Sequence, residues 1–311
     1  MEPILKIEDL SVSFTQYSRG FHRRELPVIR DLSLSLFPGE ITGVVGASGS
    51  GKSLLAHAIL GLLPYNSHME GKIIYQGEPL TQQRLKALRG REIALVPQGV
   101  TYLDPLMPVG PQLWGSHRGG QSRAKARAAL ARYGLPEGTE KKYPFQLSGG
   151  MARRVLMASA VMETPKLIIA DEPTPGLDPQ AAGRLLGHFR ELAAEGVAVL
   201  FITHDLELAL AVASRVAVFY AGETVEEADV SDFSQGRLRH PFTQALWNAL
   251  PQQGFHPIPG AQPYPGEVEQ GCPFVEQCLH AKKECGEGEI PLRPFESGLV
   301  RCLYPRKENT R

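Results

Sequence analysis

Residues 46–53 read Gly-Ala-Ser-Gly-Ser-Gly-Lys-Ser, and this segment constrains the fold more than any other part of the chain. It fits the phosphate-binding pattern G-x-x-x-x-G-K-[ST], which glycine-rich turns also match by chance unless a strand precedes it and a helix follows. Residues 41–45 have the apolar pattern of a buried strand and residues 54–62 that of a helix, so the context is correct. Because glycines let main-chain N–H groups close around phosphate oxygens, we expect a nucleotide site here.

Two residues of this loop have specific expected roles. Lys52 can reach the β- and γ-phosphates of a nucleotide, and the Ser53 hydroxyl can bind Mg²⁺. The other positions expected to surround the phosphates are Gly46, Ser48, Gly49, Ser50 and Gly51.

The bulk composition is that of an ordinary globular protein. The 311 residues include 33 Lys+Arg and 33 Asp+Glu, so the overall charge gives no support for a nucleic-acid partner. No apolar run is long enough to span a bilayer. Residues 1–4 lack the basic and apolar regions of a signal peptide, so we expect a cytosolic chain.

Apolar runs and helical patterns alternate along the first 220 residues, which predicts an α/β fold with a parallel sheet covered on both faces. Residues 15–27 and 100–120 are expected to be loops or irregular. Strands are expected at 4–14, 28–36, 41–45, 71–76, 93–97, 167–170, 197–202 and 215–220, and helices at 54–62, 121–133, 151–162, 179–194 and 206–214.

Two carboxylates follow the apolar run at residues 167–170. A central strand of this kind presents Asp171 at the carboxyl edge of the sheet, where ligands bind in open α/β folds. Asp171 is suited to holding Mg²⁺, and Glu172 to polarising a water that attacks the γ-phosphate. An acidic strand-to-loop turn is the plain alternative, and the upstream phosphate loop makes it less favoured.

Three further signals are weak when taken singly. Ser148-Gly149-Gly150 precedes a predicted helix and could bind phosphate at its positive end, although a plain helix N-cap is the better interpretation of the segment taken alone. Gln98 and His204 each follow a predicted strand, where a lone polar residue is more often structural than catalytic.

Each of these segments has a nucleotide-binding and a purely structural interpretation, and the order of the segments along the chain favours nucleotide binding. Over residues 4–225 the chain resembles ATP-binding-cassette (ABC) ATPases. The resemblance implies an ABC nucleotide-binding domain of the P-loop NTPase class at residues 1–238, with a helical subdomain at 99–165, that binds and hydrolyses ATP with Mg²⁺. It implies a composite site, in which residues 148–151 act on the nucleotide of a partner subunit.

The same resemblance assigns roles to single residues. Gln98 would sense Mg²⁺ and the γ-phosphate, His204 would hydrogen-bond the γ-phosphate, and Glu172 would complete the catalytic set. Asp178 would lie at the subunit interface. The aromatic residue that stacks on adenine would be one of Phe14, Tyr17 and Phe21.

A narrower resemblance, to the peptide/nickel importer branch, rests on four segments: Ser148–Met151, Leu103-Asp104-Pro105, His240–Leu246 and Ile258-Pro259-Gly260. It implies a peripheral ATPase on the cytoplasmic face of the inner membrane that powers uptake of peptides, nickel or a metal chelate. Its partners would be two permease subunits, a related but non-identical ATPase and, indirectly, a solute-binding protein, with no nucleic acid. Met151 replaces the usual Gln of the signature, and residues 174–178 form an unusual D-loop. Intact Lys52 and Glu172 argue against a non-catalytic regulatory nucleotide binder.

The rival hypothesis is a soluble ABC ATPase that acts on nucleic acid or ribosomes. Such proteins usually carry two cassettes or a long coiled-coil insertion. This chain has one cassette and no heptad tract.

All four cysteines lie in the expected C-terminal extension, residues 239–311, after a proline-rich stretch: Cys272, Cys278, Cys285 and Cys302. In a reducing compartment, clustered cysteines favour an iron–sulfur cluster or zinc over disulfides. The spacings match neither a zinc ribbon nor a ferredoxin, and the resemblance to the importer branch implies a [4Fe–4S] cluster. A reduced structural tail is the alternative.

Overall fold

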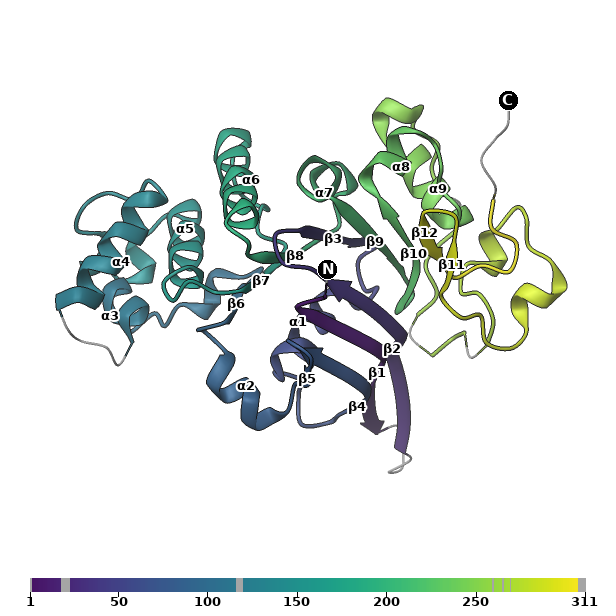
Figure 1. The fold of residues 1–311 in the computed structure, drawn as a ribbon, viewed down its shortest axis with the longest axis horizontal. Coiled ribbons are helices and arrows are strands. Elements are labelled where there is room, and N and C mark those ends of the chain that lie inside the picture. The colour runs from purple at the N-terminus through teal and green to yellow at the C-terminus, as the bar shows by residue number, and fades with distance from the viewer. Residues whose placement is uncertain are drawn as a thin grey trace. The chain divides into compact units, whose positions relative to one another are not determined.

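The computed structural model describes residues 2–17, 23–115, 120–258, 260–264, 266–268 and 270–306. The chain divides into two compact units. Unit 1 contains residues 1–37, 41–80 and 202–311, and unit 2 contains residues 38–40 and 81–201. Figure 1 shows the elements of each unit. Among the described residues, no helix combines the length and the apolar character that crossing a membrane requires.

Unit 1 begins with an antiparallel sheet in the order β2-β1-β4-β5. Its strands are β1 (Leu5–Tyr17), β2 (Arg23–Leu36), β4 (Ser67–Tyr75) and β5 (Glu78–Pro79). Bulges place Asp9 and Asp31 in the left-handed region, and the hydroxyls of Ser33 and Ser11 accept their N–H groups at 3.0 and 3.1 Å. The hydroxyls thereby satisfy main-chain donors that the bulges remove from the ladder.

The predicted loop at 15–27 is wrong over its described residues. β1 continues to Tyr17 and β2 starts at Arg23, with Thr15 opposite Glu25 and Tyr17 opposite Arg23. These residues are too polar to show a strand pattern, but main-chain pairing with a preformed partner strand stabilises them.

A second sheet of unit 1 runs in the order β11-β12-β10-β9-β3. As predicted, β3 (Ile41–Gly46) pairs in parallel with β9 (Arg215–Tyr220). The other three strands are antiparallel additions that the predicted parallel sheet did not include: β10 (Glu223–Asp229), β11 (Arg293–Phe295) and β12 (Gly298–Val300).

The helices of unit 1 are α1 (Lys52–Leu60), α7 (Leu206–Val212), α8 (Val230–Ser234) and α9 (Pro241–Asn248), with short 3₁₀ turns η5 (Pro251–Gln253), η6 (Val275–Gln277) and η7 (Lys283–Gly286). The rings of Tyr220, Phe242 and Phe274 meet in the core with centroids 4.3–5.4 Å apart. Strand β9, helix α9 and the cysteine-bearing tail therefore share one hydrophobic core.

In unit 2, the strands lie in the order β8-β7-β6, and β6 (Ile93–Val96) and β7 (Leu167–Asp171) pair in parallel. The last two residues of β8 (Ala198–Thr203) belong to unit 1. Helix α2 (Gln82–Leu88) precedes β6 in the sequence, and α6 (Pro179–Ala194) lies between β7 and β8. Figure 1 shows α3 (Val109–Trp114), α4 (Gly120–Arg132) and α5 (Gly149–Ala160) gathered together, and they pack against one another.

The prediction of an irregular segment at 100–120 needs correction as well. It contains helix α3 and the 3₁₀ turn η2 (Val100–Tyr102), and α4 begins at Gly120. A Cβ at Gly110 would overlap the Trp114 ring, so glycine in this helix permits a close contact that its low helix propensity conceals. Two more 3₁₀ turns, η3 (Thr139–Lys141) and η4 (Pro144–Gln146), precede α5.

Candidate functional site

The glycine-rich loop of unit 1 connects buried strand β3 to helix α1, as the sequence predicts. A Cβ at Gly46 would overlap the carbonyl oxygen of Phe219 on the neighbouring strand, so only glycine fits there. Gly49 and Gly51 have φ angles of 81° and 93°, which side chains disfavour. Gly51 occupies the N-cap of α1 and offers no side chain to its first N–H groups, which leaves them available to an anion.

The Lys52 ammonium lies over this loop. Its Nζ donates hydrogen bonds to the carbonyl oxygens of Gly46 and Ala47, both at 2.8 Å. The side chain of Lys52 is thereby held close to the N-terminus of α1, and only 5% of the residue is exposed. A positive charge and a helix N-terminus in one place provide strong electrostatic attraction for phosphate.

In unit 2, Glu172 and Gln98 form the centre of a second group. Gln98 Nε2 donates a hydrogen bond to Glu172 Oε2 at 2.9 Å, although the two residues are 74 positions apart. Asp171 is the buried last residue of β7, and Glu172 follows it with a φ of 43°. Left-handed backbone at a non-glycine residue is strained, and such strain is concentrated at functional sites.

Arg153 is part of this group, and sequence reasoning missed it. Its guanidinium donates to the carbonyl oxygens of Glu172 and Gln98, both at 3.0 Å, from the first half of α5. One side chain therefore holds both loops by charge-assisted hydrogen bonds. The signal in the sequence was an arginine four residues after Gly149, one helical turn from the start of α5.

Ser148 and Asp178 are both helix caps. Ser148 Oγ accepts the N–H of Met151 at 3.2 Å at the start of α5, as the plain alternative predicted. Asp178 accepts the N–H of Ala181 at 2.9 Å at the start of α6, and this hydrogen bond is the main cause that lowers the pKa of its carboxyl. Gly149, which is exposed, and Gly150, which is half-buried, are the first two residues of α5 after Ser148.

The next predicted residues to be placed belong to unit 1. His204 is exposed directly after β8, before the helix cap Asp205. Phe14 is half-buried in β1, Tyr17 is exposed at the end of that strand, and Phe21 lies outside the described residues. The structure thus brings Lys52 together with its loop in unit 1 and Gln98 with Glu172 in unit 2.

The four cysteines of the tail are free thiols that line one small cavity of about 20 Å³ in unit 1, together with His240 and Phe274. Burial raises the pKa of the Cys272 thiol to about 12, so metal binding there would displace protons. Among the residues described, no group of three or more His, Cys, Asp or Glu side chains is placed to hold a single metal ion. The thiols thus converge on one cavity without forming the tetrahedral set that zinc requires.

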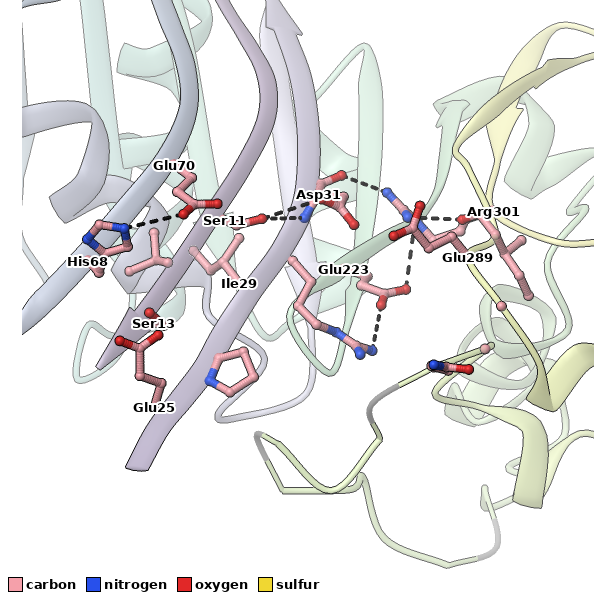
Figure 2. A pocket seen from close by; sticks show the side chains of 17 residues that line it. Ser11, Ser13, Glu25, Ile29, Asp31, His68, Glu70, Glu223, Glu289 and Arg301 are labelled. Atoms are coloured by element: carbon pink, nitrogen blue, oxygen red, sulfur yellow. Dashed lines mark hydrogen bonds and ion pairs between the residues drawn. The ribbon is translucent and has the colours of Figure 1, made fainter. Parts of the chain in front are cut away.

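A larger pocket of about 340 Å³ in unit 1 contains none of the predicted site residues. Figure 2 shows that several of its charged side chains bind one another. Glu223 forms ion pairs with Arg30 at 2.6 Å and with Arg301 at 3.8 Å. Arg301 also donates a hydrogen bond to the carbonyl oxygen of Asp31 at 2.7 Å. These contacts fasten the C-terminal segment to strand β2, so we interpret this pocket as a structural joint.

Comparison with known proteins extends this description. Residues 29–175 match the family profile "ABC transporter", and residues 225–285 match "Oligopeptide/dipeptide transporter, C-terminal region". The oligopeptide transport ATP-binding protein OppD of Escherichia coli is 35% identical over 99% of this chain and 95% of its own length. The dipeptide transport ATP-binding protein DppD of the same species is 35% identical, covering 97% of both chains.

Solved structures show the same fold. A dimeric ATP-binding cassette in a post-hydrolysis state with ADP and Pi superposes with a TM-score of 0.63 at 27% identity, covering 73% of this chain and 98% of the cassette. The protein cbiO1 of Clostridium perfringens, part of the complex cbiONQ, gives a TM-score of 0.61 at 26% identity, over 76% of this chain and 92% of its own. The α/β P-loop fold expected from the sequence is therefore confirmed.

Proposed function

Because the chain belongs to the ATP-binding subunits of ABC transporters, we propose that it hydrolyses ATP to power the import of oligopeptides or dipeptides. The observation that carries this proposal is the match of residues 225–285 to the C-terminal region of such transporters. Nickel and metal chelates are less favoured solutes, because the relatives described above carry peptide-transport names. For the same reason we set aside an action on nucleic acid or ribosomes.

The sequence motifs assign a role to each residue of the proposed hydrolytic site. The N–H groups of the loop and Lys52 would bind the phosphates, and His204 would hydrogen-bond the γ-phosphate. Ser53, Gln98 and Asp171 would hold Mg²⁺, which neutralises the charge that develops on the phosphate oxygens. Their donor atoms are oxygens, which Mg²⁺ prefers.

Glu172 is the proposed general base. Its carboxylate would accept a proton from the water that attacks the γ-phosphate, and the Gln98 amide fixes the orientation of that carboxylate. Arg153 holds the main chain of both residues, so it is a positioning residue. The capped start of α5, with Ser148, Gly149 and Gly150, would contact a nucleotide on the second ATPase subunit, and Asp178 would lie at that interface.

The segment after Gln98 is the proposed contact with the permeases. It exposes apolar side chains in a short stretch, and Leu106 is 87% exposed. The other exposed apolar residues are Val100, Tyr102 and Met107. Apolar groups gathered beside a catalytic loop are typical of a protein contact. The partners would be two permeases, a related second ATPase and indirectly a solute-binding protein, with this chain on the cytoplasmic face of the membrane.

Co-purification with the permeases tests this function. We expect the complex to hydrolyse ATP faster when the peptide-loaded solute-binding protein is added, and replacing Leu106 and Met107 with serine to release the chain from the permeases. A Leu279→Ser variant, which removes an equally exposed apolar residue elsewhere, is the control. A chain that neither co-purifies nor responds to peptide would contradict the proposal.

We also propose that the four cysteines hold a [4Fe–4S] cluster with a structural role. Each thiolate of such a cluster binds a different iron, and the four thiols line one cavity. Anaerobic purification followed by iron and acid-labile sulfide analysis tests this. Zinc without sulfide, or no metal at all, would exclude the cluster.

A further inference from the structure

Unit 2 contains a pocket of about 300 Å³ that the proposed hydrolysis does not use. We name it the basic pocket: Arg132, Tyr133, Arg153, Arg154, Arg184 and His188 line it with apolar side chains that include Met157 and Leu185. It lies where the end of α4, the middle of α5 and the first half of α6 meet. Its volume is at the lower end of the roughly 300–1,000 Å³ range of small-molecule clefts.

The charge of the basic pocket is strongly positive. Of its lining residues that the structure describes, four are arginines and none is Asp or Glu. Arg153 donates only to main-chain carbonyls in its observed contacts, and Arg154 likewise binds the carbonyls of Gly150, Tyr133 and Gly134. Carbonyl oxygens stabilise a guanidinium without cancelling its charge, so a positive potential remains in the pocket.

Carboxylates outside the lining of the pocket interact with some of these arginines. Arg132 pairs with Glu191 at 3.3 Å and with Glu195 at 3.9 Å, and Glu191 also contacts His188 at 3.1 Å. Arg184 lies on exposed surface, and its charge contributes to lowering the pKa of Asp178. Arg132, Arg153 and Arg184 thus each interact with a nearby carboxylate, which for Arg153 is Glu172, while the observed contacts of Arg154 are with carbonyl oxygens.

Tyr133 provides an independent indication of a ligand. Only 5% of the residue is exposed, and its hydroxyl has no hydrogen-bond partner among the described residues. Burial raises the pKa of this phenol to about 12, so it remains an O–H donor at neutral pH. A buried donor without an acceptor costs about 1–3 kcal/mol, and an anionic oxygen that reached this hydroxyl from the pocket would recover that cost.

We propose that the basic pocket binds a small soluble organic anion, with an oxyanion near the arginines and the Tyr133 hydroxyl and an apolar body against Met157 and Leu185. Both phosphate esters and carboxylates have this chemistry. Arg153 lines the pocket and also holds Gln98 and Glu172, so the anion would bind beside the group that positions the proposed base. The site is separate from the phosphate loop, and the proposal does not depend on the transported solute.

Calorimetric titration of the full chain with phenyl phosphate tests the proposal, with MgADP present to fill the phosphate loop. We expect saturable binding of one molecule, about tenfold tighter than inorganic phosphate or the neutral benzyl alcohol, because neither has both parts of the ligand. Benzoate distinguishes the sources: tighter binding of phenyl phosphate indicates a phosphate ester, and tighter binding of benzoate a carboxylate. Absence of saturable binding by both compounds would overturn the proposal.

Amino-acid substitutions test whether phenyl phosphate binds in the basic pocket. Arg184→Met and Tyr133→Phe should each weaken phenyl phosphate binding about fivefold or more, since each removes one donor. Arg91→Met, which removes an exposed arginine outside the pocket, should bind as the wild type does. Lys52→Ala should also bind unchanged, which separates this site from the ATP site. Unchanged affinity in both pocket variants, or loss in Lys52→Ala, would refute the assignment.

Discussion

The amide of Gln98 donates a 2.9 Å hydrogen bond to the carboxylate of Glu172, and Arg153 binds the main-chain carbonyls of both residues. Three residues that are distant in sequence thus form one hydrogen-bonded group at the end of β7. A carboxylate with a fixed orientation is what a general base requires, because proton transfer depends on geometry as well as on basicity.

Replacement of Glu172 with Gln should abolish turnover while ATP binding persists. The amide keeps the size of the side chain and can still accept the hydrogen bond from Gln98, but it cannot accept a proton. We expect a fall in kcat of about 10²–10⁴-fold, the usual contribution of a general base. Steady-state hydrolysis and nucleotide titration measure the two properties, with Glu163→Gln as a control on exposed surface. Normal turnover would show that another residue activates the water.

Replacement of Arg153 with Met should lower kcat by about tenfold and leave KM nearly unchanged, because the variant misplaces the base without removing a phosphate contact. Arg153→Lys should restore only part of the activity, since a single ammonium cannot reproduce two guanidinium hydrogen bonds. Arg91→Met is the matched control. A large rise in KM with normal kcat would instead assign Arg153 to nucleotide binding.

Replacement of Arg239 with Met should destabilise the fold by about 3–5 kcal/mol, as expected when one member of a buried ion pair is removed. Arg239 is fully buried and binds Asp232 at 2.9 Å and Glu226 at 3.3 Å. Denaturant unfolding measures the loss, and Lys283→Met, at an exposed ion pair, should change stability by less than about 1 kcal/mol. If Arg239→Met does not fold, Asp232→Asn provides the measurement, and wild-type stability in Asp232→Asn would contradict this prediction.

Glu227 predicts a pH dependence. Burial raises its pKa to about 7 despite the charge of Arg215, whereas its ordinary value is 4.5. The folded chain therefore binds this proton more tightly than the unfolded chain, and stability falls as the pH rises from 4.5 to about 7. Glu227→Gln should remove this dependence and raise the free energy of unfolding at pH 8 by about 3 kcal/mol. If Glu227→Gln and the wild type were equally stable at pH 8, the prediction would be disproved.

The parts of the fold that could be predicted depend on local pattern. A short window of sequence is enough to predict the strand, loop and helix around residues 41–62. The same is true of the apolar strand before Asp171. The ends of β1 and β2 could not be predicted, because polar residues there gain their strand structure from each other. Strand β10 was missed for a related reason: its buried Glu223, Glu226 and Glu227 look like a solvent-exposed segment until their arginine partners are known.

The candidate site divides in the same way. The order of the motifs along the sequence was enough to predict Lys52, Asp171 and Glu172, because each belongs to one of those motifs or adjoins it. Arg153 acts through main-chain carbonyls, which carry no sequence signature, so its contacts are seen only in the folded structure. The basic pocket combines three helices, and no single segment of sequence contains its charge pattern.

The ring of Phe274 lies against Tyr220 of β9 and Phe242 of α9. Truncation of the chain before the tail would therefore expose a hydrophobic surface on the nucleotide-binding portion, and the shortened protein would be prone to aggregate. Grafting a tail from another transporter ATPase would succeed only if the donor segment brought an aromatic ring of matching size to this position.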